Sequence, residues 1–195
     1  MEKIDFKKTL KHLYRAKPDI GEVDAGTGTY LSVKGQGAPG GDAYSEAIQK
    51  LYTVAFTLKF SLKHAGVLDF AVSSLETLYQ DDPAEVPRDE WRWEILIRIP
   101  EDVTEEQLRD TITAVKVSKG LDASAVTRAV LKEGRSLQTL HIGPYDQVGE
   151  VYRRMLAHME ENELVCSGLP HEIYLSDPRR VAPEKLKTIV RLPID

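Results

Sequence analysis

A strand–glycine–helix pattern occurs twice in the sequence, and this repeat constrains the fold more than any other feature. A strand-like run meets a glycine at Val33-Lys34-Gly35 and again at His141-Ile142-Gly143, and a helical stretch follows each glycine. Each half then closes on a similar run, Ile97-Arg98-Ile99-Pro100 or Val190-Arg191-Leu192-Pro193. Duplication of one strand–helix–strand–strand unit is the economical explanation. We therefore predict an α+β fold in which duplicated βαββ units form a curved antiparallel sheet with two long helices, and a ligand groove lies at the pseudo-twofold seam.

The periodicity places the individual elements. We expect one domain over 1–195, with half-repeats over about 22–101 and 123–195 and a linking helix over about 105–118, opened by a capping box. Asp42 is the expected cap of the first long helix. The remaining predicted elements are a helix at 2–16, a strand at 28–34, a glycine loop at 35–41, a helix at 43–65, a mostly extended stretch at 68–80, strands at 90–98, 125–132 and 137–142 on either side of a turn at 133–136, a helix ending near 162, a strand within 171–178 and a last strand at 186–192.

Aromatic residues cluster in the first half. Trp91 and Trp93 share one face of the clearest strand pattern, and Tyr79 precedes them in the extended stretch. A core position is open to both tryptophans and is the favoured one for Trp93. The two rings beside Tyr79 nevertheless offer stacking area for a planar or cationic ligand. Tyr52 and Phe56 widen the apolar face of the helix at 43–65, which indicates burial against a sheet and also against a cavity or partner.

The strand at 171–178 carries the most informative pair. Its period of two puts Glu172 and Tyr174 on one face and His171, Ile173 and Leu175 on the other. A carboxylate and an aromatic ring on one face are either both in solvent or both lining a cavity. In a cavity, Glu172 would have an aromatic wall and serve binding or catalysis; at an edge strand, it would be a solvated side chain.

Composition excludes several classes of function. The net charge is −5, from 26 basic and 31 acidic side chains, and no basic run is present, so we expect neither nucleic acid nor membrane as a partner. A single cysteine, Cys166, excludes an internal disulfide and a cysteine-based zinc site. The charged N-terminus lacks the apolar core of a signal peptide, and we expect a cytoplasmic protein.

The sequence carries no cofactor or metal motif with the residues and spacing that such a site requires. Gly35-Gln36-Gly37-Ala38-Pro39-Gly40 matches a dinucleotide fingerprint, but no ribose-binding acid follows at the required spacing, and a glycine lip over the groove is the better interpretation. His141, His158 and His171 lack metal-ligand spacing, so each is expected to face solvent or to be hydrogen-bonded. We predict no cofactor and no metal.

Taken together, the quoted motifs resemble the GyrI-like small-molecule-binding family, in its stand-alone branch of roughly 200 residues. The resemblance covers nearly the whole chain. It rests on the following stretches: Ala47–Tyr52, Lys59-Phe60, Leu75-Glu76, Trp91-Arg92-Trp93, His141–Asp146, His171–Pro178 and Leu186–Ile194.

This resemblance implies a seam pocket lined by aromatic residues around Glu172. In multidrug-sensing regulators the same domain follows a DNA-binding segment and binds lipophilic cations; here about twenty residues precede the first strand, too few for such a segment. Some stand-alone members hydrolyse cyclopropane-bearing DNA-alkylating natural products of the yatakemycin type, which protects the cell from these xenobiotics. By similarity, Glu172 would then act as general base, and Tyr174 or Tyr145 would stabilise the oxyanion.

The sequence leaves two main hypotheses for the function, and a third that no single residue supports or excludes. The chain is a binder of planar lipophilic, often cationic molecules, or a cofactor-free cyclopropanoid hydrolase, or a protein-partner inhibitor of the gyrase-inhibitor type. Hydrolytic relatives tend to carry a Trp pair where this chain has Leu78-Tyr79-Gln80, which favours binding. The predicted ligand-binding residues are Glu172, Tyr174, Trp91, Tyr79, Tyr52, Phe56, Tyr145, Trp93 and His171, and the predicted catalytic residues are Glu172, Tyr174 and Tyr145.

Overall fold

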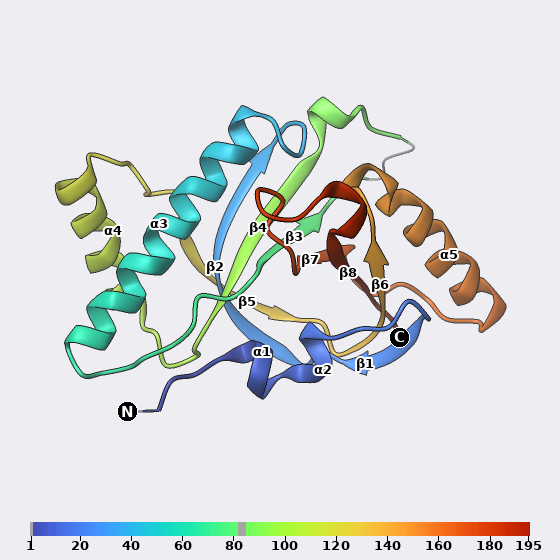
Figure 1. Cartoon of the computed structure of the whole chain (residues 1–195), viewed down its shortest axis with the longest axis horizontal. Coiled ribbons are helices and arrows are strands. Elements are labelled where there is room, and N and C mark those ends of the chain that lie inside the picture. Colours follow the sequence, from blue (N-terminus) through green and yellow to red (C-terminus); the bar gives the residue numbers. More distant parts are fainter. Residues whose placement is uncertain (1, 82–84) are drawn as a thin grey trace. The chain divides into compact units, whose positions relative to one another are not determined.

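The structure is a computed structural model that describes residues 2–81 and 85–195, and the chain divides into two compact units (Figure 1). The first unit draws on Met1–Thr9, Gly28–Ser73 and Tyr79–Leu131. The second draws on Leu10–Thr27, Ser74–Leu78 and Lys132–Asp195.

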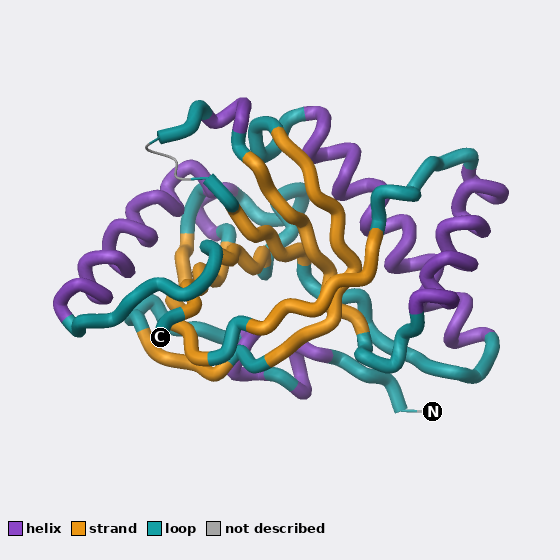
Figure 2. Tube along the Cα trace, turned by 180° about the vertical axis from the view of Figure 1, so that it is seen from behind, coloured by secondary structure: helices purple, strands orange, loops and turns teal. Residues whose placement is uncertain are grey.

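In the first unit, two helices lie side by side and three strands are adjacent. The helices are α3 (Asp42–His64) and α4 (Glu105–Lys119), which are neighbours in both Figure 1 and Figure 2. The strands follow the order β4-β2-β5, with β2 antiparallel to β4. The elements of this unit are α1 (Phe6–Thr9), β2 (Thr27–Gln36), α3, η1 (Arg88–Glu90), β4 (Arg92–Ile99), α4 and β5 (Thr127–Lys132).

The ends of the two helices show which local sequence signals act. Thr104 and Gln107 form the predicted capping box at the start of α4, and Gly120 ends this helix in the left-handed conformation at φ 65°. The prediction that Asp42 caps α3 is wrong. Gly41 occupies the N-cap position, and Asp42 is the first helical residue, where its charge still favours the positive end of the helix dipole.

The second unit is built around five strands in the order β1-β6-β8-β7-β3, and every pair in this series is antiparallel. Its elements are α2 (Lys11–Tyr14), β1 (Gly21–Asp24), β3 (Leu75–Tyr79, whose last residue counts with the first unit), β6 (Arg135–Ile142), η2 (Tyr145–Gln147), α5 (Val148–Glu161), β7 (His171–Tyr174), η3 (Pro183–Lys185) and β8 (Lys187–Pro193).

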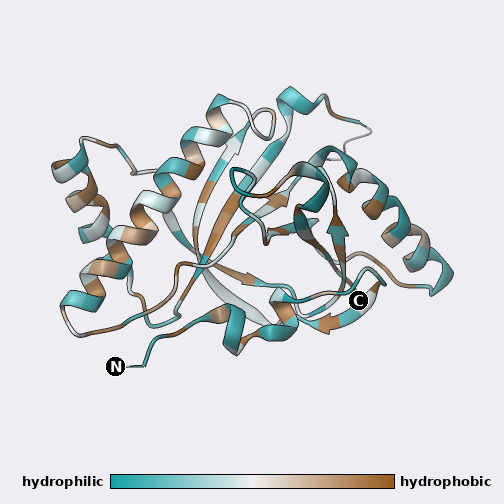
Figure 3. Cartoon of the chain, in the orientation of Figure 1, coloured by the Kyte–Doolittle hydropathy of each residue, from teal (hydrophilic) through white to brown (hydrophobic). Residues whose placement is uncertain are grey.

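Helix α5 packs against β6 and β8 because its apolar residues recur at helical spacing. Figure 3 shows alternating hydrophobic and hydrophilic segments along α5. The apolar residues form a single core with strand residues of the same unit: Leu137, Val148, Val151, Met155, Met159, Val190, Leu192 and Ile194. Full burial of one such side chain contributes roughly 1.5–3 kcal/mol, so this core holds α5 against the strands.

The predicted fold class is confirmed: the protein is α+β, with antiparallel strands and two long helices in matching places, α3 and α5. The single helix predicted at 2–16 is wrong, because Leu10 leaves helical geometry at φ −113° and ψ 52° and separates α1 from α2. Only Leu75–Tyr79 of the stretch at 68–80 is a strand. The predicted glycine loop starts later than expected, because β2 continues to Gln36.

The strands on either side of residues 133–136 exist, but they have separate partners. β5 lies beside β2 in the first unit, and β6 lies between β1 and β8 in the second. Likewise, β1 and most of β3 belong to the second unit although they fall in the first predicted half-repeat. The half-repeat boundaries and the groove at their seam remain predictions.

Candidate functional site

Glu172 lies in β7 on the face that α5 covers, and two tyrosine hydroxyls hold its carboxylate. Its backbone partners are Val190 on β8 and Thr77 on β3. Tyr174, two residues further along β7, donates to Oε2 at 2.9 Å, and Tyr152 of α5 donates to Oε1 at 3.4 Å. The residue is 8% exposed. A carboxylate with two phenolic donors is thus nearly enclosed between β7 and α5.

A third tyrosine extends the aromatic wall. The ring of Tyr145, from η2, meets the ring of Tyr174 edge-on, with centroids 5.3 Å apart and an interplanar angle of 75°. Gly143 gives the preceding turn its shape at φ +145°, a conformation that side-chain-bearing residues rarely adopt. Nε2 of His141 lies 3.0 Å from the carbonyl oxygen of Pro144, which ties this turn to β6.

The environment of Glu172 favours the protonated carboxyl group. Burial raises the pKa of Glu172 to about 7, although hydrogen bonds from Tyr174 and Tyr152 and the charge of His171 oppose the rise. Near neutral pH this group therefore exchanges a proton readily. Such a carboxyl group can serve as a general base or become the countercharge of a bound cation.

The opposite face of β7 carries a buried set of charged groups. His171 has no exposed surface; its Nδ1 lies 2.9 Å from Oε1 of Glu133, and its Nε2 lies 3.0 Å from Oε2 of Glu76. Arg191, the cross-strand partner of His171, donates from Nη1 to Oε2 of Glu133 at 2.9 Å. Tyr14 of α2 donates to Oε1 of Glu76 at 2.7 Å. We call Glu76, Glu133, His171 and Arg191 the ionic cluster.

Within the ionic cluster, charge pairing outweighs the cost of burial. Burial alone would lower the pKa of His171, but the charges of Glu133 and Glu76 and the contacts with them raise it to about 9. Burial alone would raise the pKa of Glu133, but His171 and Arg191 lower it to about 2. At neutral pH, His171 is therefore an imidazolium and Glu133 a carboxylate.

Four of the predicted ligand-binding aromatic residues form two pairs in the first unit. The rings of Tyr79 and Trp91 meet edge-on with centroids 5.8 Å apart, and Nε1 of Trp91 donates to the carbonyl oxygen of Val86 at 2.9 Å. Tyr52 and Phe56 stack one helical turn apart on α3 with centroids 6.2 Å apart, and Phe56 is 45% exposed.

Trp93 belongs to the core of the first unit, as the favoured interpretation of its strand position predicted. It is 1% exposed, its Nε1 donates to the carbonyl oxygen of Gly37 at 3.0 Å, and its ring meets Tyr44 edge-on. The indole lies so close to Gly35 that any side chain at that position would collide with the ring. Gly35 is thus a packing residue of β2.

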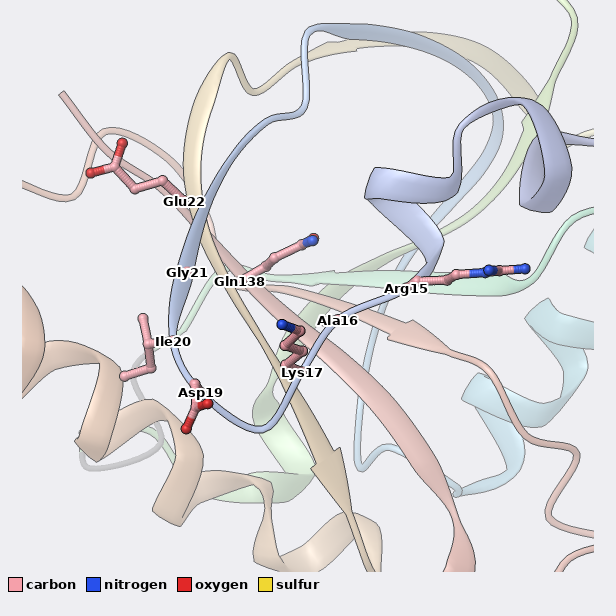
Figure 4. Close-up of a pocket in the computed structure, with 8 residues that line it drawn as sticks. All are labelled: Arg15, Ala16, Lys17, Asp19, Ile20, Gly21, Glu22 and Gln138. Carbon is pink, nitrogen blue, oxygen red and sulfur yellow. The ribbon is translucent and has the colours of Figure 1, made fainter.

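A shallow groove of about 320 Å³ lies elsewhere in the second unit (Figure 4). It is lined by residues 15–17, 19–22 and 138. In Figure 4 the side chains of Arg15, Asp19 and Glu22 point in different directions, so they offer no convergent set of polar groups.

Among residues 2–81 and 85–195, no cluster of three or more His, Cys, Asp and Glu side chains is arranged to hold a metal ion. In the same described ranges, no helix is long and apolar enough to cross a membrane.

Comparison with known proteins identifies the family. The model of the GyrI-like small molecule binding domain matches residues 18–195. The chain belongs to the GyrI-like family. None of the curated proteins compared with it matches.

Two crystal structures from Listeria innocua resemble this GyrI-like chain over its whole length. One is of a hydrolase, with 36% identity over 98% of this chain and 100% of that chain and a TM-score of 0.89. The other is of an uncharacterized conserved protein, with 36% identity over the same shares and a TM-score of 0.91. The C-terminal domain of EcmrR shares the fold at 14% identity, over 91% of this chain and 97% of that chain, with a TM-score of 0.62.

Sequence reasoning did not assign site roles to Tyr152 or to Glu76, Glu133 and Arg191. Tyr152 was visible as the polar-tipped member of the inner face of α5. Arg191 stands in an apolar strand, and a buried arginine requires a partner, so the run Val190–Pro193 held a usable signal. Glu133 falls in a turn-like stretch and gave no signal of burial.

Proposed function

We propose that this GyrI-like domain binds planar aromatic, often cationic small molecules at Glu172. The observation that carries the proposal is the arrangement at β7: a nearly enclosed carboxyl group, held by the hydroxyls of Tyr174 and Tyr152 and flanked by the ring of Tyr145. Aromatic faces attract planar and cationic groups, and a poorly solvated carboxylate adds charge pairing.

The protonation state of Glu172 makes cation affinity depend on pH. A bound cation favours the ionised carboxylate, so cation binding releases a proton from Glu172 when the site is protonated. Because the pKa of Glu172 is about 7 in the free protein, cation affinity should rise as the pH increases from 6 to 8. A neutral aromatic ligand of the same shape should show little change over that range.

The first unit carries aromatic ring pairs of its own. Trp91 with Tyr79, and Phe56 with Tyr52, provide ring pairs of the kind that planar ligands stack on. If Trp91 contacts ligand, titration will quench tryptophan emission, and Trp91→Phe will remove most of the quenching while Trp93→Phe preserves it.

A dye titration tests the binding proposal. Fluorescence anisotropy of rhodamine 6G, a planar cation, is measured against the purified protein at pH 6, 7 and 8. We expect micromolar affinity that increases with pH. Glu172→Gln should weaken the cation tenfold or more while leaving a neutral aromatic dye unaffected, and Glu161→Gln, at an exposed carboxylate of α5, serves as the matched control. Equal losses for cationic and neutral dyes in Glu172→Gln would overturn the role of Glu172 as countercharge.

Hydrolysis of a strained ring is the second candidate function. Two observations favour it: the pKa of Glu172, about 7, suits a general base at neutral pH, and a relative with 36% identity is a hydrolase. In this reaction, Glu172 accepts a proton from water as the water oxygen bonds to a cyclopropane carbon. The breaking carbon–carbon bond sends its electron pair to a conjugated carbonyl oxygen, which Tyr174 or Tyr145 stabilises and which then takes up a proton.

Turnover distinguishes the two candidates. Ring opening of a cyclopropanoid alkylator is followed by chromatography with wild type, Glu172→Gln and Tyr174→Phe in the presence of a chelator. A hydrolase should lose about a hundredfold or more in rate with Glu172→Gln and about a hundredfold with Tyr174→Phe. A rate in Glu172→Gln equal to that of wild type would overturn the base assignment, and complete absence of turnover in wild type would leave binding alone.

A further inference from the structure

The ionic cluster and the Glu172 site lie on opposite faces of the same short strand. His171 and Glu172 are consecutive in β7, so their side chains leave the backbone in opposite directions. The two side chains are therefore separated only by the thickness of the strand. Both residues are buried, at 0% and 8% exposure, and little water is available to screen one charge from the other.

Neighbouring elements place a carboxylate beside each nitrogen of the His171 ring. Glu133, which follows β5, contacts Nδ1, and Glu76, on β3, lies at Nε2. Arg191 adds a second cation from β8, and it also donates from Nη2 to the carbonyl oxygen of Leu13 at 3.0 Å. Gln138 of β6 accepts from Arg191 at 3.3 Å and donates to the carbonyl oxygen of His12 at 2.7 Å.

The cluster holds two acidic and two basic side chains. Glu76 and Glu133 face His171 and Arg191, and the hydroxyl of Tyr14 donates to Glu76. On the other face, Glu172 meets only Tyr152 and Tyr174 as polar partners among the contacts described for it. Removal of one cation would leave the cluster with a net negative charge directly behind Glu172.

We propose that His171, flanked behind β7 by two carboxylates, is a positioning residue whose positive charge favours the ionised form of Glu172 and so the negative charge that the site offers to a ligand. This inference rests on the proposed function for its biological meaning. It adds that ligand affinity depends on a buried cluster on the opposite face of β7. The influence of the His171 charge on the pKa of Glu172 is downward, against the effect of burial.

The test measures the ionisation of Glu172 directly, without any ligand. Side-chain carboxyl resonances of glutamate are followed by carbon-13 NMR from pH 4 to pH 9, and the Glu172 resonance is assigned by its absence in Glu172→Gln. In His171→Gln, where the charge that opposes the rise from burial is removed, the midpoint of the Glu172 titration should rise by about 0.2–0.3 pH units. A purely structural role predicts the opposite sign, because loosening the strand admits water and lowers the midpoint towards 4.5.

A matched pair of variants separates charge from packing. Glu133→Gln removes a negative charge from the same cluster, so the Glu172 midpoint should stay or fall, never rise. The double variant His171→Gln/Glu133→Gln removes one charge of each sign and should bring the midpoint back to within about 0.1 unit of wild type. A midpoint in the double variant as high as in His171→Gln, or a fall in His171→Gln, would overturn the proposal.

The wild-type protein provides a measurement that survives if His171→Gln fails to fold. Nitrogen-15 NMR of the His171 ring should show both nitrogens protonated at pH 7.5, and a neutral ring at that pH would overturn the proposal. Rhodamine 6G binding is then measured in each folded variant, and its pH dependence should shift with the NMR midpoint. Failure of the dye to bind would refute the proposed function, whereas the NMR titrations alone decide the role of His171.

Discussion

Glu133 and Glu172 are both buried carboxylates of the second unit, yet their pKa values move in opposite directions. The pKa of Glu133 is lowered to about 2, and the pKa of Glu172 is raised to about 7. Burial by itself would raise the pKa of both carboxyl groups. The difference lies in their partners, since Glu133 faces the cations of His171 and Arg191, whereas Glu172 faces two neutral hydroxyls.

This contrast separates a structural charge from a working one. A paired carboxylate in a balanced cluster stays ionised over the whole physiological range and holds strands together, but removal of one partner leaves its charge uncompensated. A buried carboxylate without a cation can change its state when a ligand or a proton arrives. One strand, β7, thus presents a fixed charge on one side and a responsive one on the other.

The largest expected effect comes from removing a basic side chain from the ionic cluster. Arg191→Met removes one cation with little change in volume and leaves Glu133 with His171 alone, so the free energy of unfolding should fall by about 3–5 kcal/mol. Urea denaturation at pH 7 measures it. The conservative change on the other face, Glu172→Gln, should cost no stability at pH 7. If both variants lost the same amount, the contrast between the two faces would be wrong.

The next effect is the pH dependence of stability, in which the two faces differ in sign. Glu133, whose pKa falls from 4.5 to about 2, stabilises the folded state above pH 4.5, and this contribution is lost as the pH falls through about 2. Glu172, whose pKa rises from 4.5 to about 7, stabilises below pH 4.5 and loses that contribution as the pH rises through about 7. His171 likewise contributes fully below pH 6.5 and loses its contribution as the pH rises through about 9.

The Glu172→Gln variant isolates the contribution of Glu172 to the pH dependence of stability. Relative to wild type, the variant should gain stability progressively between pH 4.5 and 7, by up to about 3 kcal/mol, because it never ionises. The decline above pH 7, which belongs to His171, should remain in the variant. Urea titrations at pH 4.5, 6, 7 and 9 measure both slopes. Parallel curves for wild type and variant would show that Glu172 ionises with an ordinary pKa.

Sequence patterns predicted those features that depend on neighbouring residues. The alternation in 90–98 gave β4, the capping box gave the start of α4, and the period of two in β7 placed Glu172 and Tyr174 on one face. Patterns failed where the outcome depends on distant contacts. The segment 2–16 has helical spacing, but its second part forms α2 and is bound by hydrogen bonds to β6 and β8 rather than continuing one helix.

The site was predictable to the same extent. The shared face of Glu172 and Tyr174 followed from alternation, and the core position of Trp93 followed from its place further inside the strand. The ionic cluster did not, because Glu133 lies 38 residues from His171 and 58 from Arg191 along the chain. Its turn-like context, Glu133-Gly134, indicates solvent exposure in the absence of those partners. Burial of this glutamate is a property of the tertiary structure.

The smallest expected effect distinguishes the two hydroxyls that hold Glu172. Tyr174→Phe removes the donor at 2.9 Å and should raise the midpoint of the Glu172 titration by about one pH unit, because a hydrogen bond to the ionised form is lost. Tyr152→Phe removes the donor at 3.4 Å, a weaker bond, and should raise the midpoint by only about 0.3 units. Both variants keep the ring and hence the aromatic wall. Carbon-13 NMR titration of the carboxyl group resolves the two shifts, with Tyr145→Phe as the control that keeps both donors. The prediction is wrong if the larger shift belongs to Tyr152→Phe or if either variant lowers the midpoint. In that case these hydrogen bonds do not limit how far burial raises the pKa of Glu172, and the contrast with Glu133 has another cause.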